Sequence, residues 1–207
     1  MSQSEAAAPS GHDPAVERRQ GVRYMTVMRV ATLRTEHGEE LCLVRNISEG
    51  GLKARIWSNL DVGAAVTAQF KSGYDLPGTV VWRRDDHVGV QFQAPAEVAL
   101  ILNGDDAPAA GLRPRAPRIR LETPARVQVG ARDHRVMLRD ISQGGAKVRL
   151  DVPDQWIEAE PPIILMITGL PATEGSMRWR DQDVVGLAFN TPISLDILAS
   201  WLVARRG

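Results

Sequence analysis

The sequence contains two copies of one segment, and this duplication limits the folds that are open to the chain. The phrase RNISEGGLKARI at residues 45–56 returns as RDISQGGAKVRL at residues 139–150. A second block, GTVVWRRDDHVGVQF at 78–92, returns as GSMRWRDQDVVGLAF at 175–189. The second copy is three residues longer between the two blocks. The 207 residues therefore form two repeats of a unit of about 85–90 residues rather than one large domain.

Each copy is predicted to be a series of short strands. In copy one, stretches rich in Val, Thr, Leu and Phe are separated by polar, Gly or Pro turns and cover residues 27–35, 39–46, 51–57, 64–70, 79–84 and 88–92. Six short antiparallel strands predict a small closed barrel or sandwich. After the last strand of copy two, apolar residues follow a helical spacing at Ile193, Ile197, Leu198, Trp201 and Leu202. We expect this helix to cover an open end or edge of its barrel, with a dimerisation surface as the alternative.

Composition narrows the class of protein further. No apolar run approaches the roughly 18 residues of a membrane span, and the N-terminus lacks the pattern of a secretory signal. The lone cysteine, Cys42, sits in an apolar stretch that predicts a core position and suits a reducing compartment. The prediction is a cytoplasmic protein without membrane insertion. The four histidines are scattered and show no metal-ligand spacing.

Domain boundaries follow from composition and from the repeat. Residues 1–16 are predicted to be a disordered tail, 17–104 the first domain and 113–206 the second. Residues 105–112 lie in a stretch rich in Gly, Pro and Ala and are predicted to be the linker.

Basic residues gather just before each predicted barrel. Arginines stand at 18, 19 and 23 before copy one and at 113, 115, 118 and 120 before copy two. Residues 113–149 carry ten Lys or Arg against three acids, although the net charge of the chain is zero. Such a cluster attracts phosphates, or else forms a solvated basic face. Guanidinium groups grip phosphate bidentately and also bond or stack on guanine.

A polar turn is the chemically unusual part of the repeat. Asn46 and Ser48 in copy one, like Asp140 and Ser142 in copy two, form turns because their side chains bond nearby backbone amides. The glycine that follows permits a positive φ or a close backbone approach. The turn therefore has two interpretations, a tight loop between two strands or a ligand site that combines short polar groups with exposed backbone.

Together these motifs resemble the PilZ domain family. The family pattern is an RRxxxR leader, then (D/N)xSxxG about twenty residues later, then a G…W…G…F block. Copy one matches it at Arg18, Arg19, Arg23, Asn46, Ser48 and Gly51. Copy two matches the turn at Asp140, Ser142 and Gly145. The resemblance covers roughly residues 17–104 and 112–205.

The resemblance implies a fold class and a ligand. PilZ domains are six-stranded antiparallel barrels followed by a C-terminal helix, so the chain is expected to be mainly β, with two such barrels in tandem. Many are bacterial receptors for cyclic di-GMP. By analogy, Arg19 and Arg23 would hold guanine and phosphate, Asn46 and Ser48 would complete the site, and Gly51 would keep the turn open. Arg18 occupies the position that the family associates with two intercalated ligand molecules.

Copy two departs from the pattern in its leader. Arg118 matches Arg23, and Arg113 matches Arg18, but Pro114 stands where Arg19 does. A proline carries no charge and restricts the backbone. Ligand binding through Arg113, Arg118, Asp140, Ser142 and Gly145 is therefore the weaker expectation.

We predict a non-enzymatic cyclic di-GMP receptor without cofactor or metal that acts by changing shape for a downstream protein. Two alternatives stay open. One is a protein-interaction scaffold whose ligand sites have partly degenerated, as Pro114 suggests. The other is a nucleic-acid-binding barrel, against which stands an aromatic content of only 5%. The tryptophans Trp82 and Trp179 are expected to pack against their barrels, with the edge of a ligand pocket as the alternative.

Overall fold

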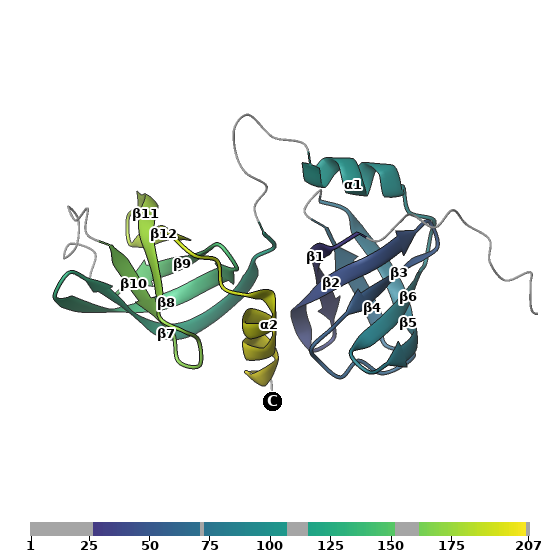
Figure 1. The fold of residues 1–207 in the computed structure, drawn as a ribbon, viewed down its shortest axis with the longest axis horizontal. Coiled ribbons are helices and arrows are strands. Elements are labelled where there is room, and N and C mark those ends of the chain that lie inside the picture. The colour runs from purple at the N-terminus through teal and green to yellow at the C-terminus, as the bar shows by residue number, and fades with distance from the viewer. Residues whose placement is uncertain (1–26, 71–72, 107–115, 152–161, 206–207) are drawn as a thin grey trace, which may run out of the picture.

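A computed structural model describes residues 27–70, 73–106, 116–151 and 162–205 and places them in two closed barrels, each followed by a helix (Figure 1). The elements of barrel 1 are β1 (Arg29–Thr35), β2 (Gly38–Ser48), β3 (Gly51–Arg55), β4 (Ala65–Gln69), β5 (Asp75–Arg84), β6 (His87–Phe92) and α1 (Val98–Asp106). The strand order is β1-β2-β3-β6-β5-β4, and β4 pairs with β1 to close the barrel. All pairs are antiparallel.

Barrel 2 repeats this arrangement. Its elements are β7 (Ile119–Val129), β8 (Arg132–Ser142), β9 (Gly145–Leu150), β10 (Ile163–Met166), β11 (Thr173–Asp181), β12 (Val184–Phe189) and α2 (Leu195–Ala204). The order β7-β8-β9-β12-β11-β10 closes through an antiparallel β10–β7 pair. The predicted fold class is therefore confirmed. Among the strands of copy one, the main difference is that β5 begins at Asp75, four residues earlier than the sequence predicts.

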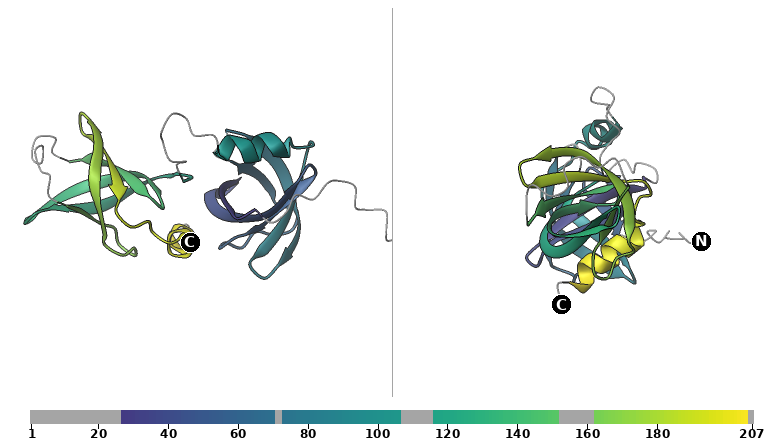
Figure 2. Two further views of the ribbon diagram at one scale, coloured as in Figure 1. Left: turned by 45° about the horizontal axis from the view of Figure 1, so that its top comes forward. Right: turned by 90° about the vertical axis from the view of Figure 1, so that its left-hand side faces the viewer.

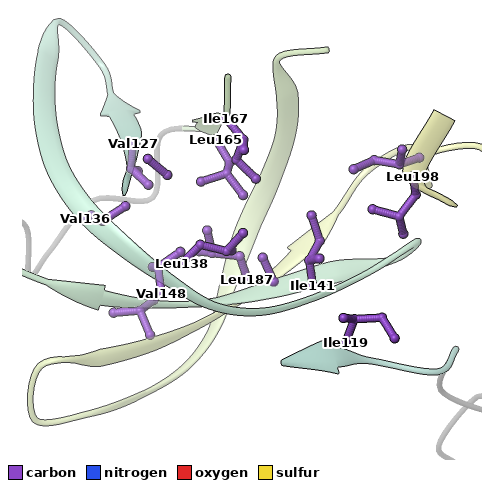
Figure 3. Packing of buried hydrophobic residues seen from close by; sticks show 14 of the residues in the cluster. Ile119, Val127, Val136, Leu138, Ile141, Val148, Leu165, Ile167, Leu187 and Leu198 are labelled. Carbon is purple, nitrogen blue, oxygen red and sulfur yellow. The ribbon is translucent and has the colours of Figure 1, made fainter. Parts of the chain in front are cut away.

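Alternating burial explains why these segments form barrels. In β3, Leu52 and Ala54 are buried while their neighbours are not, as expected of a strand with one face toward a core. Figure 3 shows buried side chains of several strands of barrel 2, among them Leu138, Leu165 and Leu187, gathered in its interior. Each such side chain contributes roughly 1.5–3 kcal/mol relative to exposure.

Cys42 is fully buried, as predicted. Burial, with a smaller contribution from the charge of Glu40, raises the pKa of its thiol. The thiol is therefore protonated and unreactive at neutral pH.

The helices cover their barrels and end the two repeats. Val98 and Ile101 of α1 are buried in the core of barrel 1. In α2, the Ser194 hydroxyl accepts a hydrogen bond from the Ile197 amide and caps the helix. Leu198, Trp201 and Leu202 enter the core of barrel 2, which confirms the predicted position of this helix. Within the described residues, neither helix is long and apolar enough to span a membrane.

Two sequence predictions differ from the structure in detail. Ile197, expected on the apolar face of α2, is 46% exposed. Helix α1 continues to Asp106, two residues inside the stretch predicted to be a linker. The remaining linker residues and the predicted disordered tail lie outside the described residues.

Helix α2 also contacts barrel 1. Leu41 of β2, only 2% exposed, belongs to the apolar cluster of barrel 2, and Val30 and Trp57 pack against that cluster. The left view in Figure 2 agrees with Figure 1 in placing α2 on the side of barrel 2 that faces barrel 1. The C-terminal helix is therefore shared by the two barrels.

Candidate functional site

A β-bulge turns the polar residue of each repeated turn toward the outside of its barrel. In β2 the register shifts between Val44 and Asn46, so that Val44 and Ile47 are buried while Asn46 is exposed. In β8 the same shift falls between Leu138 and Asp140. Bulges re-aim side chains in this way because a slip of one residue exchanges the two faces of a strand.

The bulge aligns each polar residue with a lysine, a glycine and a tryptophan across four strands. In barrel 1, Asn46 lies opposite Lys53, Lys53 opposite Gly89 and Gly89 opposite Trp82. We call these four residues the barrel-1 row.

Barrel 2 contains the equivalent alignment, which we call the barrel-2 row. Asp140 lies opposite Lys147, Lys147 opposite Gly186 and Gly186 opposite Trp179. The same four positions are therefore brought together on the outer wall of both barrels.

Each tryptophan of the two rows lies on the glycine opposite to it. A Cβ atom added to Gly89 would come within 2.1 Å of Trp82 Nε1, and one added to Gly186 within 2.3 Å of Trp179 Cε2. Only glycine leaves room for the indole here. Trp82 is nevertheless 40% exposed and Trp179 43% exposed. The prediction that both pack against their barrels is confirmed, and each also offers an exposed ring surface on which a base can stack.

The serine and the second glycine of each turn have structural roles. The Ser48 hydroxyl donates to the Gly51 carbonyl over 3.2 Å, and Ser142 bonds Gly145 in the same way. A Cβ atom on Gly51 would lie 2.3 Å from the Val90 carbonyl oxygen, so this glycine permits close strand pairing. The exposed glycine of the turn is Gly50, which has no atom within 4 Å of a Cβ.

Barrel 2 carries an additional cluster of charges at its row. Asp140, 7% exposed, forms an ion pair with Arg118 and lies 3.4 Å from Lys147 Nζ. The Lys147 ammonium also lies 5.7 Å from the centre of the Trp179 ring. In barrel 1 the position of Asp140 is held by Asn46, which is neutral and exposed. The two rows therefore share their geometry but differ in charge.

The predicted site residues fall into two groups. Arg18, Arg19, Arg23 and Arg113 lie outside the described residues, so their placement stays a prediction. The remaining members lie on or next to the two equivalent hairpins: Asn46, Ser48 and Gly51 on β2–β3, and Arg118, Asp140, Ser142 and Gly145 at β7–β9.

Lys53 and Lys147 were not predicted as site residues from the sequence. The signal was present, because a lysine follows the second glycine by two residues in both copies. A second signal was the spacing of seven residues from tryptophan to glycine in both copies.

Among the described residues, no group of three or more His, Cys, Asp or Glu side chains could hold a metal ion. The chemistry that the rows offer is stacking on indole, charge pairing with lysine, and hydrogen bonding to Asn46 or Asp140. These are the interactions of a nucleotide-binding surface.

Comparison with known proteins identifies the family. The model of the PilZ domain matches residues 17–102 and 112–203. No curated protein matches the sequence.

Several solved structures are similar to the chain, with low sequence identity. One is Borreliella burgdorferi PlzA in complex with c-di-GMP, at 13% identity and TM-score 0.38, covering 90% of this chain and 94% of that chain. Another is Bacillus subtilis inhibitor of motility MotI/DgrA, at 15% identity and TM-score 0.34, covering 88% and 97%. A third is Escherichia coli YcgR in complex with c-di-GMP, at 15% identity and TM-score 0.30, covering 86% and 83%.

The two family matches cover most of the sequence, and each falls on one of the six-stranded barrels described above. The chain belongs to the PilZ domain family.

Proposed function

We propose that this protein is a receptor for cyclic di-GMP that binds the ligand on the outer wall of barrel 1 and has no catalytic activity of its own. The observation that carries the proposal is the barrel-1 row, in which an exposed amide, a lysine and an exposed indole lie across four adjacent strands. The family of the chain supports the choice of ligand. The proposal includes the cytoplasmic location and the absence of a cofactor predicted from the sequence.

The chemistry of the row suits a guanine dinucleotide. The Trp82 ring offers a face to one base, and base–aromatic stacking is typically worth about 1–3 kcal/mol. The Lys53 ammonium offers charge to a phosphate. The Asn46 amide both donates and accepts hydrogen bonds, and guanine presents acceptors at O6 and N7 and a donor at N2.

The repeat supports a position of the leader arginines on the same wall. Arg118 lies at the barrel-2 row, where its Nη2 atom is 3.4 Å from a Cβ built on Gly145. Arg23 holds the equivalent position in copy one. We therefore infer that the copy-one leader brings Arg23 and Arg19 to the barrel-1 row and completes the site there.

The charge difference between the rows supports unequal roles for the two copies. In barrel 2, Arg118 and Lys147 are both engaged with Asp140, so a ligand phosphate must compete with a carboxylate for each cation. Pro114 additionally replaces one leader arginine. Barrel 1 is therefore proposed as the sensor, and barrel 2 as the part that relays the signal to a protein partner.

Titration calorimetry on the full chain tests the proposal. Cyclic di-GMP should bind saturably, whereas GTP, cyclic di-AMP and a single-stranded oligonucleotide should not. Lys53→Ala should weaken binding at least several-fold. Arg34→Ala, which removes a half-exposed arginine of β1, is the matched control and should leave affinity unchanged. Binding of the oligonucleotide alone would favour a nucleic-acid-binding protein, and no binding of any kind would favour the scaffold.

A further inference from the structure

A single arginine of barrel 1 connects that barrel to α2. Arg55 Nε lies 2.6 Å from Asp86 Oδ2 in its own barrel, and Arg55 Nη1 lies 2.9 Å from Asp196 Oδ1 in the first turn of α2. The same Asp196 oxygen accepts a hydrogen bond from Trp57 Nε1 over 3.2 Å. The Arg55 guanidinium also lies 4.9 Å from the centre of the Trp57 ring. Asp196 is therefore held to barrel 1 by two side chains that also contact each other.

Among the described residues, this contact is a polar part of the interface between the barrels. An apolar part consists of Leu41, Val30 and Trp57, which pack with the core cluster of barrel 2. The Arg55 side chain is 30% exposed and that of Asp196 is 62% exposed, so an anion in solution can reach the ion pair. Arg55 can therefore exchange Asp196 for another anion, because its guanidinium is charged and the ion pair is accessible to solvent.

Arg55 also lies next to the candidate ligand site. Gly51, Lys53 and Arg55 alternate along β3 with the buried residues Leu52 and Ala54 and therefore face the same side of the strand. Residues two positions apart in a strand are separated by roughly 6.6 Å. A guanidinium on its flexible side chain can cover that distance. A phosphate held by Lys53 would therefore lie within reach of Arg55.

We propose that Arg55 is a switch residue: a phosphate bound on the outer wall of barrel 1 competes with Asp196 for its guanidinium, and ligand binding thereby loosens α2 from barrel 1. The inference rests on the proposed function, because it requires an anionic ligand at the barrel-1 row. It adds how ligand binding changes the arrangement of the barrels, namely through strand β3 and the ion pair between Arg55 and Asp196.

The coupling must act in both directions. If α2 and the ligand compete for Arg55, removing the charge of Asp196 strengthens ligand binding by the same factor by which the ligand weakens the α2 contact. A partly exposed ion pair changes an equilibrium by roughly 2- to 5-fold. The expected effect is therefore modest and calls for a variant that changes charge and nothing else.

Asp196→Asn is that variant, because asparagine keeps the volume and the oxygen that accepts from Trp57. Asp133→Asn, at an exposed aspartate of β8 that lies opposite Gln128 of β7, controls for the change in net charge. Spin labels at Val62→Cys and Ala131→Cys, both exposed, report the separation of the barrels by pulsed electron paramagnetic resonance. Cys42 can stay in place because its buried, protonated thiol resists labelling.

The labelled full chain should show one narrow distance distribution that broadens and shifts at saturating cyclic di-GMP. Asp196→Asn should shift the distribution without ligand and bind cyclic di-GMP about 2- to 5-fold more tightly. Asp133→Asn should behave as the unsubstituted chain in both measurements.

Saturable binding with an unchanged distance distribution, or equal affinity in Asp196→Asn, would overturn the switch and leave the receptor function intact. Absence of cyclic di-GMP binding in calorimetry would overturn the receptor function and the switch together. In that case the distances in ligand-free Asp196→Asn would still show whether this carboxylate holds α2 against barrel 1.

Discussion

Replacing Gly89 with alanine should weaken ligand binding while barrel 1 stays folded. The glycine lies beneath the Trp82 ring, where a Cβ atom would be 2.1 Å from Nε1 and 2.3 Å from Cε2. Because both separations are much shorter than a van der Waals contact, the indole must leave the barrel wall. The atoms in its way belong to a half-exposed side chain rather than to the backbone, so the ring can move while the barrel stays closed.

The cost to folding should be smaller than the cost to binding. Overpacking costs about 1–3 kcal/mol. Removing a glycine from a strand returns roughly 0.5–1 kcal/mol. The free energy of unfolding should therefore fall by at most about 2.5 kcal/mol. Losing the stacking surface costs about 1–3 kcal/mol of binding, which corresponds to a loss of roughly 5- to 150-fold in affinity for cyclic di-GMP.

Urea unfolding and titration calorimetry measure the two effects. Gly50→Ala is the matched control, because nothing lies within 4 Å of a Cβ at that turn position. It should change neither stability nor affinity. Combining Gly89→Ala with Trp82→Ala should cost no more affinity than Trp82→Ala alone, since both act through the same ring. Unchanged affinity in Gly89→Ala would refute the assignment of the ligand to this wall.

Four further outcomes are expected. Gly51→Ala should destabilise barrel 1 by about 3 kcal/mol in urea unfolding, since its Cβ would meet a backbone carbonyl at 2.3 Å that cannot move without opening the strand pair; a loss under 1 kcal/mol would contradict this. Asp140→Asn should lower the free energy of unfolding by about 1–3 kcal/mol because it leaves two cations facing each other; equal stability would show that the cluster is solvated. Arg18→Leu should reduce the calorimetric stoichiometry at barrel 1 from two ligand molecules to one, and one molecule in the unsubstituted chain would exclude the stacked pair. The hydrogen bond from Arg55 lowers the pKa of Asp86, so its stabilising contribution is complete above its ordinary pKa of about 3.9 and is lost as the pH falls through the lowered value. Asp86→Asn should therefore destabilise the chain more at pH 6 than at pH 2, and a difference of the same size at both would contradict the ion pair.

The strands and helices were predictable because they depend on local patterns. Alternating apolar residues separated by turns predicted the strands of copy one, and the repeat extended them to copy two. The interior position of Cys42 followed from the apolar residues around it. The early start of β5 was not predicted because its first residues include Gly78 and Pro77, which are rare in strands but tolerated here.

The row itself was only partly predictable. A bulge adds one unpaired residue and leaves no mark in composition, so the outward turn of Asn46 requires knowledge of the register. The tight approach of Gly51 to the neighbouring strand likewise depends on pairing between β3 and β6, which are distant in sequence.

Contacts between the barrels could not be predicted from either copy alone. Helical spacing placed Ile197 on the apolar face of α2, but the first turn of that helix also carries Asp196, which faces barrel 1. The partner of Asp196 is Arg55, 141 residues away. Only the arrangement of both barrels in space brings this pair together.

We propose that barrel 1 is the cyclic di-GMP sensor and that the ligand lies on its outer wall. Calorimetric titration of the full chain with cyclic di-GMP, compared with Trp82→Ala and Trp179→Ala, distinguishes this site from its equivalent on barrel 2. These two tryptophans hold equivalent positions and similar exposure, so each variant is the structural control of the other. Binding should be lost or weakened at least 5-fold in Trp82→Ala and retained in Trp179→Ala. Retained affinity in Trp82→Ala together with loss in Trp179→Ala would contradict the assignment and place the sensor in barrel 2.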